Sequence, residues 1–177
     1  MKLMKNNILL LVVLTIGISS FAQKDSIVIK PNYLSGITTK ADFKEAPYVI
    51  WFDKHYENYS LDTTVTKEIK NHLKGVTIKA FMGTWCGDSK REVPHLYKLL
   101  EAVNFNEKNL EMITVNRSKK TSDNLQEGLN IIRVPTIIFY KKDKEIGRYV
   151  EYPRETLEKD ILQILKEEPY KHAYDNN

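Results

Sequence analysis

The residue best suited to chemistry is Cys86, the only cysteine in the 177-residue chain. Before it, the apolar run from Val76 to Met82 ends at Gly83 and predicts a buried strand. After it, apolar side chains recur with the spacing of one helical face, at Val93, Leu96, Tyr97 and Leu100. The sequence therefore places the thiol between the end of a strand and the start of a helix.

A thiol at a helix start faces unpaired N–H groups and the positive end of the helix dipole, which favour the reactive thiolate. Lys90 and Arg91 add to this effect and Asp88 opposes it, and the sequence does not decide which is stronger. Asp88 is equally suited to stabilising the first helical turn. Ser89 either donates a hydrogen bond to the thiolate or only fills the space of a second cysteine. Without such a setting, a lone cysteine is usually an inert, buried side chain.

A second segment, Val134-Pro135-Thr136, begins a strand that turns at Lys142 to Lys144 into another strand. With both segments in hand, the chain resembles the thioredoxin superfamily from about Val76 to Leu165. The matching residues are Trp85, Cys86, Gly87, Lys90 and Pro94 in the first motif and Pro135 and Thr136 in the second. The resemblance implies a cis peptide bond before Pro135, facing the thiol. It also implies that Val134, Pro135 and Thr136 bind the substrate.

The departures from that family bear on function. Where dithiol members have Cys-x-x-Cys, this chain has Cys86-Gly87-Asp88-Ser89, so no intramolecular disulfide can form. The buried acid that dithiol members carry six residues before the nucleophile is here Ala80. Cys86 with Ser89 thus forms a one-thiol site, with Trp85, Gly87, Asp88, Lys90 and Arg91 as its surroundings. Another thiol must release any mixed disulfide.

We predict an α/β protein with a thioredoxin-like βαβαββα core, a central mixed sheet flanked by helices, in residues 76–166. Leu110 to Val115 is its second strand, Thr121 to Leu129 a short helix, and Leu157 to Leu165 the last helix. Residues 23–75 form a helical extension packed on the core. Ser26 to Lys30 is expected to be an edge strand, and residues 167–177 a frayed tail.

Two helices are predicted in the extension. One carries an aromatic face through Tyr48, Trp51, Phe52, Tyr56 and Tyr59. This face is expected to pack on the core, and the alternative is a peptide-binding wall beside Cys86. The other helix runs through Val65, Ile69 and Leu73 and ends at Gly75.

Residues 1–22 have the pattern of a cleaved signal peptide. Lys2 and Lys5 precede the apolar run Ile8 to Ile18, and cleavage is predicted after Ala22. The run is shorter than the ~20 residues that span a bilayer, so an uncleaved anchor is the weaker alternative and the mature chain has no stable membrane span. Removing these residues lowers the formal charge from +4 by two, to +2. We therefore expect a periplasmic or otherwise exported domain.

The sequence contains no pattern typical of the other classes of function considered. Acids are interspersed with the basic residues, so nucleic acid is not an expected partner. Metal binding is not expected either, because the four histidines are scattered, at His55, His72, His95 and His172. No cofactor is implied. A peroxidase is disfavoured because the Pro-x-x-x-Thr-x-x-Cys setting is absent around Cys86.

Two hypotheses follow. The first is a monothiol thiol-disulfide oxidoreductase or isomerase, in which Cys86 attacks a disulfide of a protein or peptide client and an external thiol donor completes the exchange. The second is a non-catalytic module that binds extended peptides in the groove beside Pro135.

Overall fold

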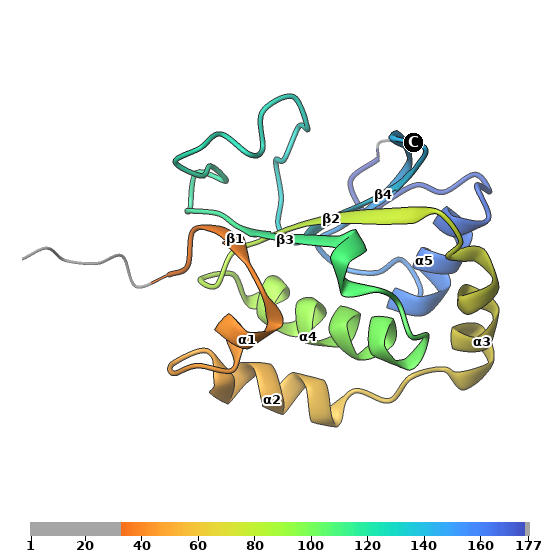
Figure 1. The fold of residues 1–177 in the computed structure, drawn as a ribbon, viewed down its shortest axis with the longest axis horizontal. Coiled ribbons are helices and arrows are strands. Elements are labelled where there is room, and N and C mark those ends of the chain that lie inside the picture. The colour runs from red at the N-terminus through yellow and green to blue at the C-terminus, as the bar shows by residue number, and fades with distance from the viewer. Residues whose placement is uncertain (1–32, 176–177) are drawn as a thin grey trace, which may run out of the picture. The chain divides into compact units, whose positions relative to one another are not determined.

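A computed structural model describes residues 33–175, which form a five-stranded mixed sheet with the strand order β1-β3-β2-β4-β5 (Figure 1). The strands are β1 (Gly36–Thr38), β2 (Val76–Met82), β3 (Leu110–Thr114), β4 (Thr136–Lys141) and β5 (Lys144–Val150). The helices are α1 (Lys40–Phe43), α2 (Val49–Asn58), α3 (Thr63–His72), α4 (Gly87–Ala102) and α5 (Leu157–Leu165), with a 3-10 turn η1 (Glu107–Asn109). Only the β2–β3 pair is parallel. The predicted α/β class, a central mixed sheet flanked by helices, is confirmed.

The central strand β2 sends its side chains to two different cores. Ile78, Ala80 and Met82 point toward the helices, where they join the larger apolar cluster. Phe81 points to the opposite face and belongs to a second cluster with Ile113 and Ile138. Alternation with a period of two therefore makes the strand apolar on both sides, which is why the sequence shows a nearly continuous apolar run.

The helices predicted from periodicity are present, and polar caps define where two of them begin. Asp62 accepts hydrogen bonds from the N–H groups of Thr64 and Val65 at the start of α3. Thr156 caps α5 in the same way through the Lys159 N–H. Helix α4 begins at Gly87 with Cys86 as its N-cap residue, as the sequence predicts.

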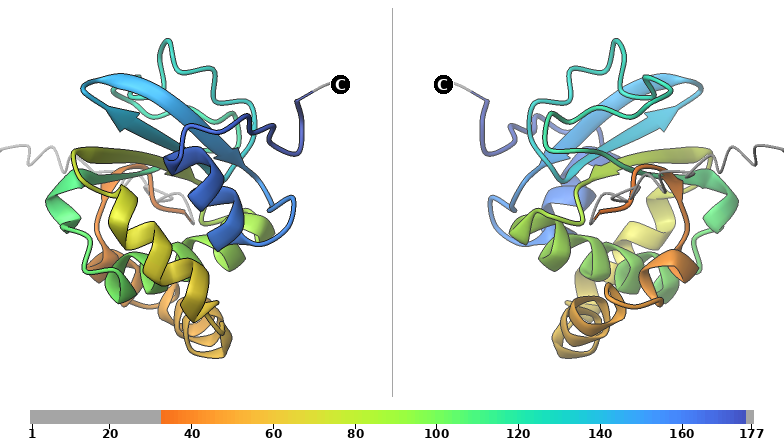
Figure 2. Two further views of the ribbon diagram at one scale, coloured as in Figure 1. Left: turned by 90° about the vertical axis from the view of Figure 1, so that its right-hand side faces the viewer. Right: turned by 90° about the vertical axis from the view of Figure 1, so that its left-hand side faces the viewer.

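The N-terminal extension contributes to the sheet and to the core. The strand predicted at residues 26–30 lies outside the described residues, and the edge strand that the structure shows is β1, antiparallel to β3. Helix α2 packs against α4 below the sheet (Figures 1 and 2). Its Phe52 is fully buried and lies 5.7 Å from the ring of Phe43 and 5.8 Å from that of Tyr97, centroid to centroid. The aromatic face is thus packed into the core.

The helix predicted from Thr121 to Leu129 is wrong, because this stretch is a series of turns within a long loop between β3 and β4. Thr121 Oγ1 accepts a hydrogen bond from the Leu125 N–H, and Gln126 Oε1 accepts one from the Thr121 N–H. Such side-chain bonds to the backbone compete with a helical ladder. Asn124 and Gly128 also have positive φ angles of 54° and 73°.

The C-terminal segment also differs from its prediction as a frayed tail. Residues 167–175 fold back on the domain, and the Tyr170 hydroxyl donates to Asp160 at 3.0 Å. Gln163 Nε2 donates to the Pro169 carbonyl at 2.6 Å. Burial, followed by the nearby Asp160 carboxylate, raises the pKa of Tyr170. The short polar tail is therefore ordered by hydrogen bonds to residues of α5, which no local sequence pattern predicts.

If α2 is an integral layer of the domain, Phe52→Ala should destabilise it strongly. Replacing a buried phenylalanine with alanine costs about 3 to 5 kcal/mol, through lost apolar burial and the cavity left behind. Urea denaturation measures this loss. Ile50→Ala is the matched control, because Ile50 lies on the same helix with 75% of its surface exposed and should change stability by less than about 0.5 kcal/mol. Equal small effects from both variants would contradict the packing role of α2.

Candidate active site

Cys86 occupies the N-cap position of α4, with extended backbone angles of φ −92° and ψ 130°. Its carbonyl accepts the first helical hydrogen bond, from the Lys90 N–H at 3.1 Å. Its own N–H donates to the Gly83 carbonyl at 2.9 Å, which closes a tight turn after β2. The thiol is partly exposed. It therefore stands at the positive end of a 16-residue helix, on the side that solvent can reach.

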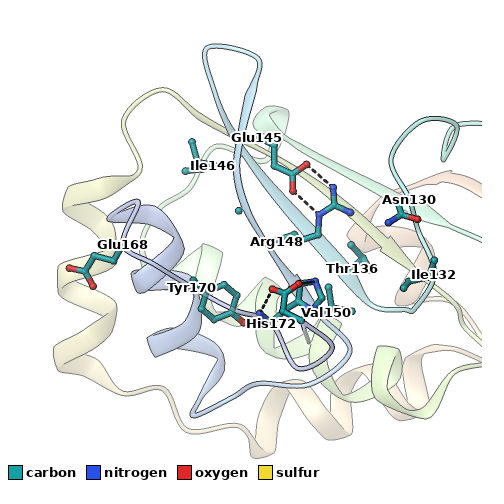
Figure 3. A pocket seen from close by; sticks show the side chains of 12 residues that line it. Asn130, Ile132, Thr136, Glu145, Ile146, Arg148, Val150, Glu168, Tyr170 and His172 are labelled. Atoms are coloured by element: carbon teal, nitrogen blue, oxygen red, sulfur yellow. Dashed lines mark hydrogen bonds and ion pairs between the residues drawn. The ribbon is translucent and has the colours of Figure 1, made fainter. Parts of the chain in front are cut away.

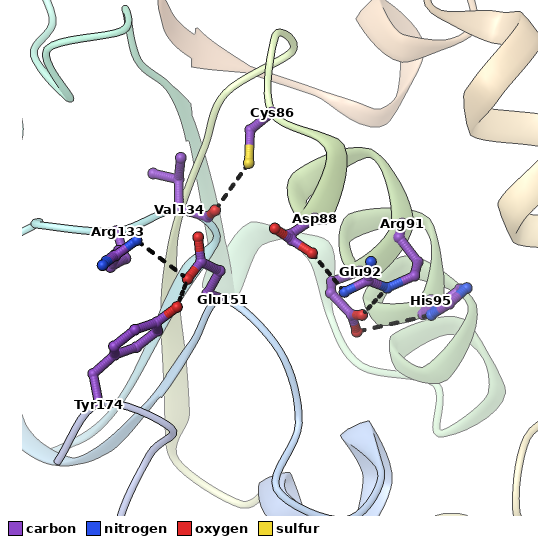
Figure 4. Close-up of polar contacts among 9 residues, drawn as sticks. All are labelled: Cys86, Asp88, Arg91, Glu92, His95, Arg133, Val134, Glu151 and Tyr174. Atoms are coloured by element: carbon purple, nitrogen blue, oxygen red, sulfur yellow. Dashed lines mark hydrogen bonds and ion pairs between the residues drawn. The ribbon is translucent and has the colours of Figure 1, made fainter.

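The sulfur faces the backbone of the segment before β4. Cys86 Sγ donates to the Val134 carbonyl oxygen at 3.2 Å (Figure 4). The peptide bond between Val134 and Pro135 is cis. This contact brings together two segments 48 residues apart in the chain. A backbone carbonyl beside the thiol is the acceptor that an extended client peptide would use for its own N–H.

The segment before β4 is held by several contacts of its own. The Thr136 hydroxyl donates to the Arg133 carbonyl at 2.7 Å, and the Glu151 N–H donates to the Pro135 carbonyl at 2.7 Å. Arg133 also lies 3.7 Å from the Glu151 carboxylate and 4.4 Å from the ring centroid of Tyr174. Tyr174 donates to Glu151 as well (Figure 4). Thr136, predicted to bind substrate, is only 2% exposed and instead fixes the shape of this segment.

Ser89 makes a structural contact, which neither of the two alternatives drawn from the sequence included. Its side chain is fully buried, and its Oγ accepts a hydrogen bond from the Gly83 N–H at 3.2 Å. No hydrogen bond joins Ser89 to Cys86 among residues 33–175. The serine therefore ties the turn before Cys86 to the first turn of α4 and satisfies a buried N–H group.

Trp85 is fixed beside the thiol from two directions. Its Nε1 donates to the Val115 carbonyl at 2.8 Å, and the guanidinium of Arg117 lies 5.2 Å from its ring centroid. Gly83 is needed for this placement, because a Cβ there would lie 2.5 Å from the indole. By contrast, a Cβ at Gly87 would meet no atom within 4 Å. The position beside the indole that only glycine can fill is therefore Gly83, and not Gly87 of the Trp-Cys-Gly motif.

A chain of charges runs along the first two turns of α4. Arg91 Nη2 lies 2.8 Å from Asp88 Oδ1, and Arg91 Nε lies 2.6 Å from Glu92 Oε1 (Figure 4). Asp88 therefore shares a guanidinium with a second carboxylate. Lys90, which sequence reasoning grouped with Arg91, has no ion pair within the part of the chain that the structure describes.

Glu92 is the residue of this site that sequence reasoning missed. It is 3% exposed, with His95 Nδ1 at 3.8 Å from its other oxygen. Burial alone would raise the pKa of Glu92, but the hydrogen bonds from His95 and Arg91 outweigh it and hold the pKa below its usual range. The sequence did contain a sign that Glu92 is buried. Leu96 and Leu99 follow it by four and seven residues, so Glu92 lies on the same buried face of the helix.

Two of the histidines that are far apart in sequence meet in space. The rings of His55 and His95 lie 6.2 Å apart, and Tyr59 stacks on His95 at 3.7 Å. Burial, followed by the proximity of His95, lowers the pKa of His55. Across residues 33–175, no group of three or more histidine, cysteine or acidic side chains is arranged to hold a metal ion. The histidines here act as packing residues.

A hollow of about 360 Å³ lies between β5 and the C-terminal segment, and Cys86 does not line it (Figure 3). Its main charged side chain, Arg148, is already bound by both oxygens of Glu145 at 2.6 Å and donates to the Leu129 carbonyl. The guanidinium is therefore satisfied within the chain.

A reachable thiol at a helix start, facing a backbone carbonyl that precedes a proline, defines a protein of the thioredoxin-like class. The chain belongs to the thioredoxin family, whose model, described as thioredoxin, matches residues 46–165. That match includes α2 and α3, so these helices are part of the family domain.

Several individual proteins are similar to this chain. A thioredoxin-like protein of Acanthamoeba polyphaga mimivirus is 31% identical over 90 residues, which are 51% of this chain and 63% of that protein, so the match spans less than two thirds of that relative. A protein of unknown function from Pseudomonas aeruginosa superposes with a TM-score of 0.55 at 16% identity, over 75% of this chain and 93% of that one. Mitochondrial thioredoxin 3 of Saccharomyces cerevisiae is 24% identical over 53% of this chain and 84% of its own, with a TM-score of 0.32.

The buried charge of Glu92 should make stability depend on pH. Its pKa in the folded protein is below the ordinary value of 4.5, so its ionised form stabilises the fold fully above that value. This contribution is lost as the pH falls through the folded pKa. Wild-type protein should therefore lose stability relative to Glu92→Gln as the pH falls below 4.5, measured by urea denaturation.

The control for this comparison is Glu57→Gln, which removes an exposed acid from α2. Its stability relative to wild type should change little over the same pH range. If the two variants followed the same pH curve, Glu92 would not be a stabilising buried carboxylate.

Proposed function

We propose that this protein is an exported monothiol thiol-disulfide oxidoreductase or isomerase that acts on disulfides of protein or peptide clients. Membership of the thioredoxin family supports redox chemistry in general. The observation that carries the finer proposal is the geometry of Cys86, a partly exposed thiol at the start of α4 in contact with the Val134 carbonyl. Ser89 occupies the position of a second thiol and is buried.

Cys86 takes part in two thiol exchanges. In the first, the Cys86 thiolate attacks one sulfur of a client disulfide, so that a Cys86–client disulfide forms while the other client sulfur leaves as a thiolate. In the second, an external thiolate attacks the client sulfur of the mixed disulfide, so that Cys86 leaves as a thiolate and the client sulfur is joined to the donor. A second donor thiol then attacks the donor sulfur of that disulfide, which leaves the client as a dithiol and the donor as its own disulfide. In isomerisation, a thiolate of the client itself makes the second attack. Each step breaks one sulfur–sulfur bond and forms one.

The backbone at Val134 and Pro135 provides a binding site for the client beside the thiol. Hydrogen bonds from the Thr136 hydroxyl to the Arg133 carbonyl and from the Glu151 N–H to the Pro135 carbonyl hold the backbone on both sides of Val134 before a client arrives. A client segment in extended form would replace the Cys86 thiol as the partner of the Val134 carbonyl. Backbone recognition of this kind tolerates varied client sequences, because the affinity comes from main-chain groups.

Export is part of the proposal and rests on the signal-like residues 1–22, which lie outside the described structure. Within residues 33–175, none of the helices combines the length and the apolar character that a bilayer span requires. We expect protein recovered from the producing cell to begin at Gln23, as N-terminal sequencing would show. Recovered protein that still carries Met1 would contradict cleavage.

Because the chain has no second cysteine, we expect the rate of disulfide reduction to depend on an added thiol. Wild-type protein should reduce insulin slowly by itself and markedly faster when glutathione is added, since an external thiol must free Cys86. Cys86→Ser, whose hydroxyl cannot form the mixed disulfide, should abolish the gain over glutathione alone. Ser89→Cys should let a thiol of the same chain release Cys86, so that without added thiol each protein molecule reduces a single insulin disulfide and is itself oxidised to an internal disulfide. This release should be incompletely efficient, because Ala80 provides no buried acid to assist the new thiol.

The alternative function has its own signature in the same assay. A peptide-binding module would show no thiol-dependent turnover, and Cys86→Ser would bind unfolded peptides as well as wild type does. Binding is measured by fluorescence anisotropy of a labelled, reduced peptide. That pair of results would replace the oxidoreductase proposal with the binding module.

A further inference from the structure

A compact turn rich in positive charge follows β3, in residues 116–120, which we call the cationic turn. It carries Arg117, Lys119 and Lys120 within four positions. Asn116 fixes its shape, because the Asn116 Oδ1 accepts from the Ser118 N–H at 2.9 Å and from the Lys120 N–H at 3.1 Å. The Asn116 N–H in turn donates to the Lys120 carbonyl at 3.0 Å. The charges are therefore carried on a defined backbone.

The cationic turn is tied to the neighbour of the reactive cysteine. Arg117 lies over the ring of Trp85, and Trp85 Nε1 donates to the carbonyl of Val115, the residue just before the turn. Trp85 directly precedes Cys86 in the chain. Two contacts thus hold Arg117 and the start of the cationic turn against the residue that precedes Cys86.

These charges are not neutralised by the protein. Within residues 33–175, no ion pair involves Arg117, Lys119 or Lys120. The two acids nearest the thiol in the contacts described above do have partners, since Asp88 pairs with Arg91 and Glu151 with Arg133. The exposed acids of the same loop, Asp123 and Glu127, come after the turn. The cationic turn itself therefore carries uncompensated positive charge.

We propose that the cationic turn selects client segments that carry aspartate or glutamate next to their disulfide-forming cysteine. The inference rests on the proposed function and adds a substrate class to it. In this proposal, a client cysteine joined to Cys86 has its flanking residues beside Trp85 and the cationic turn. Carboxylates there meet the cations of the turn, which speeds association more than it strengthens the final complex, and salt weakens the effect.

The test uses three peptides of one sequence whose single cysteine carries a 2-pyridyl disulfide. Both residues flanking the cysteine are aspartate in the first peptide, asparagine in the second and lysine in the third. Attack by the Cys86 thiolate on the peptide sulfur forms the mixed disulfide, and the departing pyridylthiolate takes up a proton as the coloured pyridine-2-thione. Each second-order rate is divided by the rate of the same peptide with 2-mercaptoethanol, which removes differences in intrinsic reactivity.

In low salt, the normalised rate should be roughly three- to tenfold higher for the aspartate peptide than for the asparagine peptide, and lower again for the lysine peptide. Added salt should reduce these ratios toward one. Arg117→Gln combined with Lys119→Gln and Lys120→Gln should remove most of the preference in low salt. The matched control is Lys67→Gln, an exposed lysine on α3 without an ion pair, which should leave the preference unchanged.

The outcomes separate this inference from the function on which it rests. Equal normalised rates for the three peptides, or a preference that survives loss of the turn charges, would overturn the acidic-client inference while leaving the thiol chemistry intact. No thione release from any peptide, with the release by 2-mercaptoethanol normal, would overturn the proposed function itself. Circular dichroism confirms that the triple variant is folded before its rates are compared.

Discussion

The register between β2 and β4 is the constraint on which the site depends. These strands pair antiparallel with Phe81 opposite Thr136, so the end of β2 lies beside the beginning of β4. The chain leaving β2 turns into α4 at Cys86, and the chain entering β4 passes through Val134 and Pro135. The sulfur and the Val134 carbonyl meet because of this pairing. A slip by one residue would exchange the two faces of β2, so that Ile78, Ala80 and Met82 would face the smaller cluster and Phe81 the larger one.

Buried polar groups hold the two sides of this meeting point in place. Ser89 binds the Gly83 N–H and joins the turn to the helix, whereas Thr136 and the Glu151 N–H shape the opposite segment. Arg91 lies between Asp88 and Glu92, so a charge beside the thiol is linked to a buried carboxylate. A buried carboxylate is costly unless it is paired, which explains why Glu92 and Arg91 occur together. Several residues around the thiol therefore fix the backbone beside it or balance the charges near it, and do not themselves face a substrate.

The two faces of the sheet are covered in different ways, and this difference affects the surface around Cys86. Helices cover one face, whereas the loop between β3 and β4 covers the other near the thiol (Figures 1 and 2). Leu125 and Leu129 from this loop pack against the second core cluster together with Trp85. A loop bends more freely than a helix, and its first residues form the cationic turn. The surroundings of the thiol on the Trp85 side are therefore set by turn chemistry.

The sequence by itself determined the elements that depend on local patterns. A continuous apolar run located β2, helical periodicity located α2, α3, α4 and α5, and the strand-to-helix transition placed Cys86 at a helix start. Two motifs with intervening elements in the family order were enough to predict the fold, because they reflect local backbone requirements. Whether residues 1–22 direct export stays a prediction from the sequence.

Only the tertiary structure decided the contacts between distant segments. The buried role of Ser89, the pairing of Arg91 with Glu92 and the meeting of His55 with His95 depend on three-dimensional packing. Residues 121–129 form turns and not the predicted helix, because side-chain bonds to the backbone and positive φ angles are incompatible with a helical ladder. The order of residues 167–175 likewise comes from Tyr170 and Tyr174 contacting remote acids. Local propensities are worth fractions of a kcal/mol per residue, so burial and hydrogen bonds to distant partners override them.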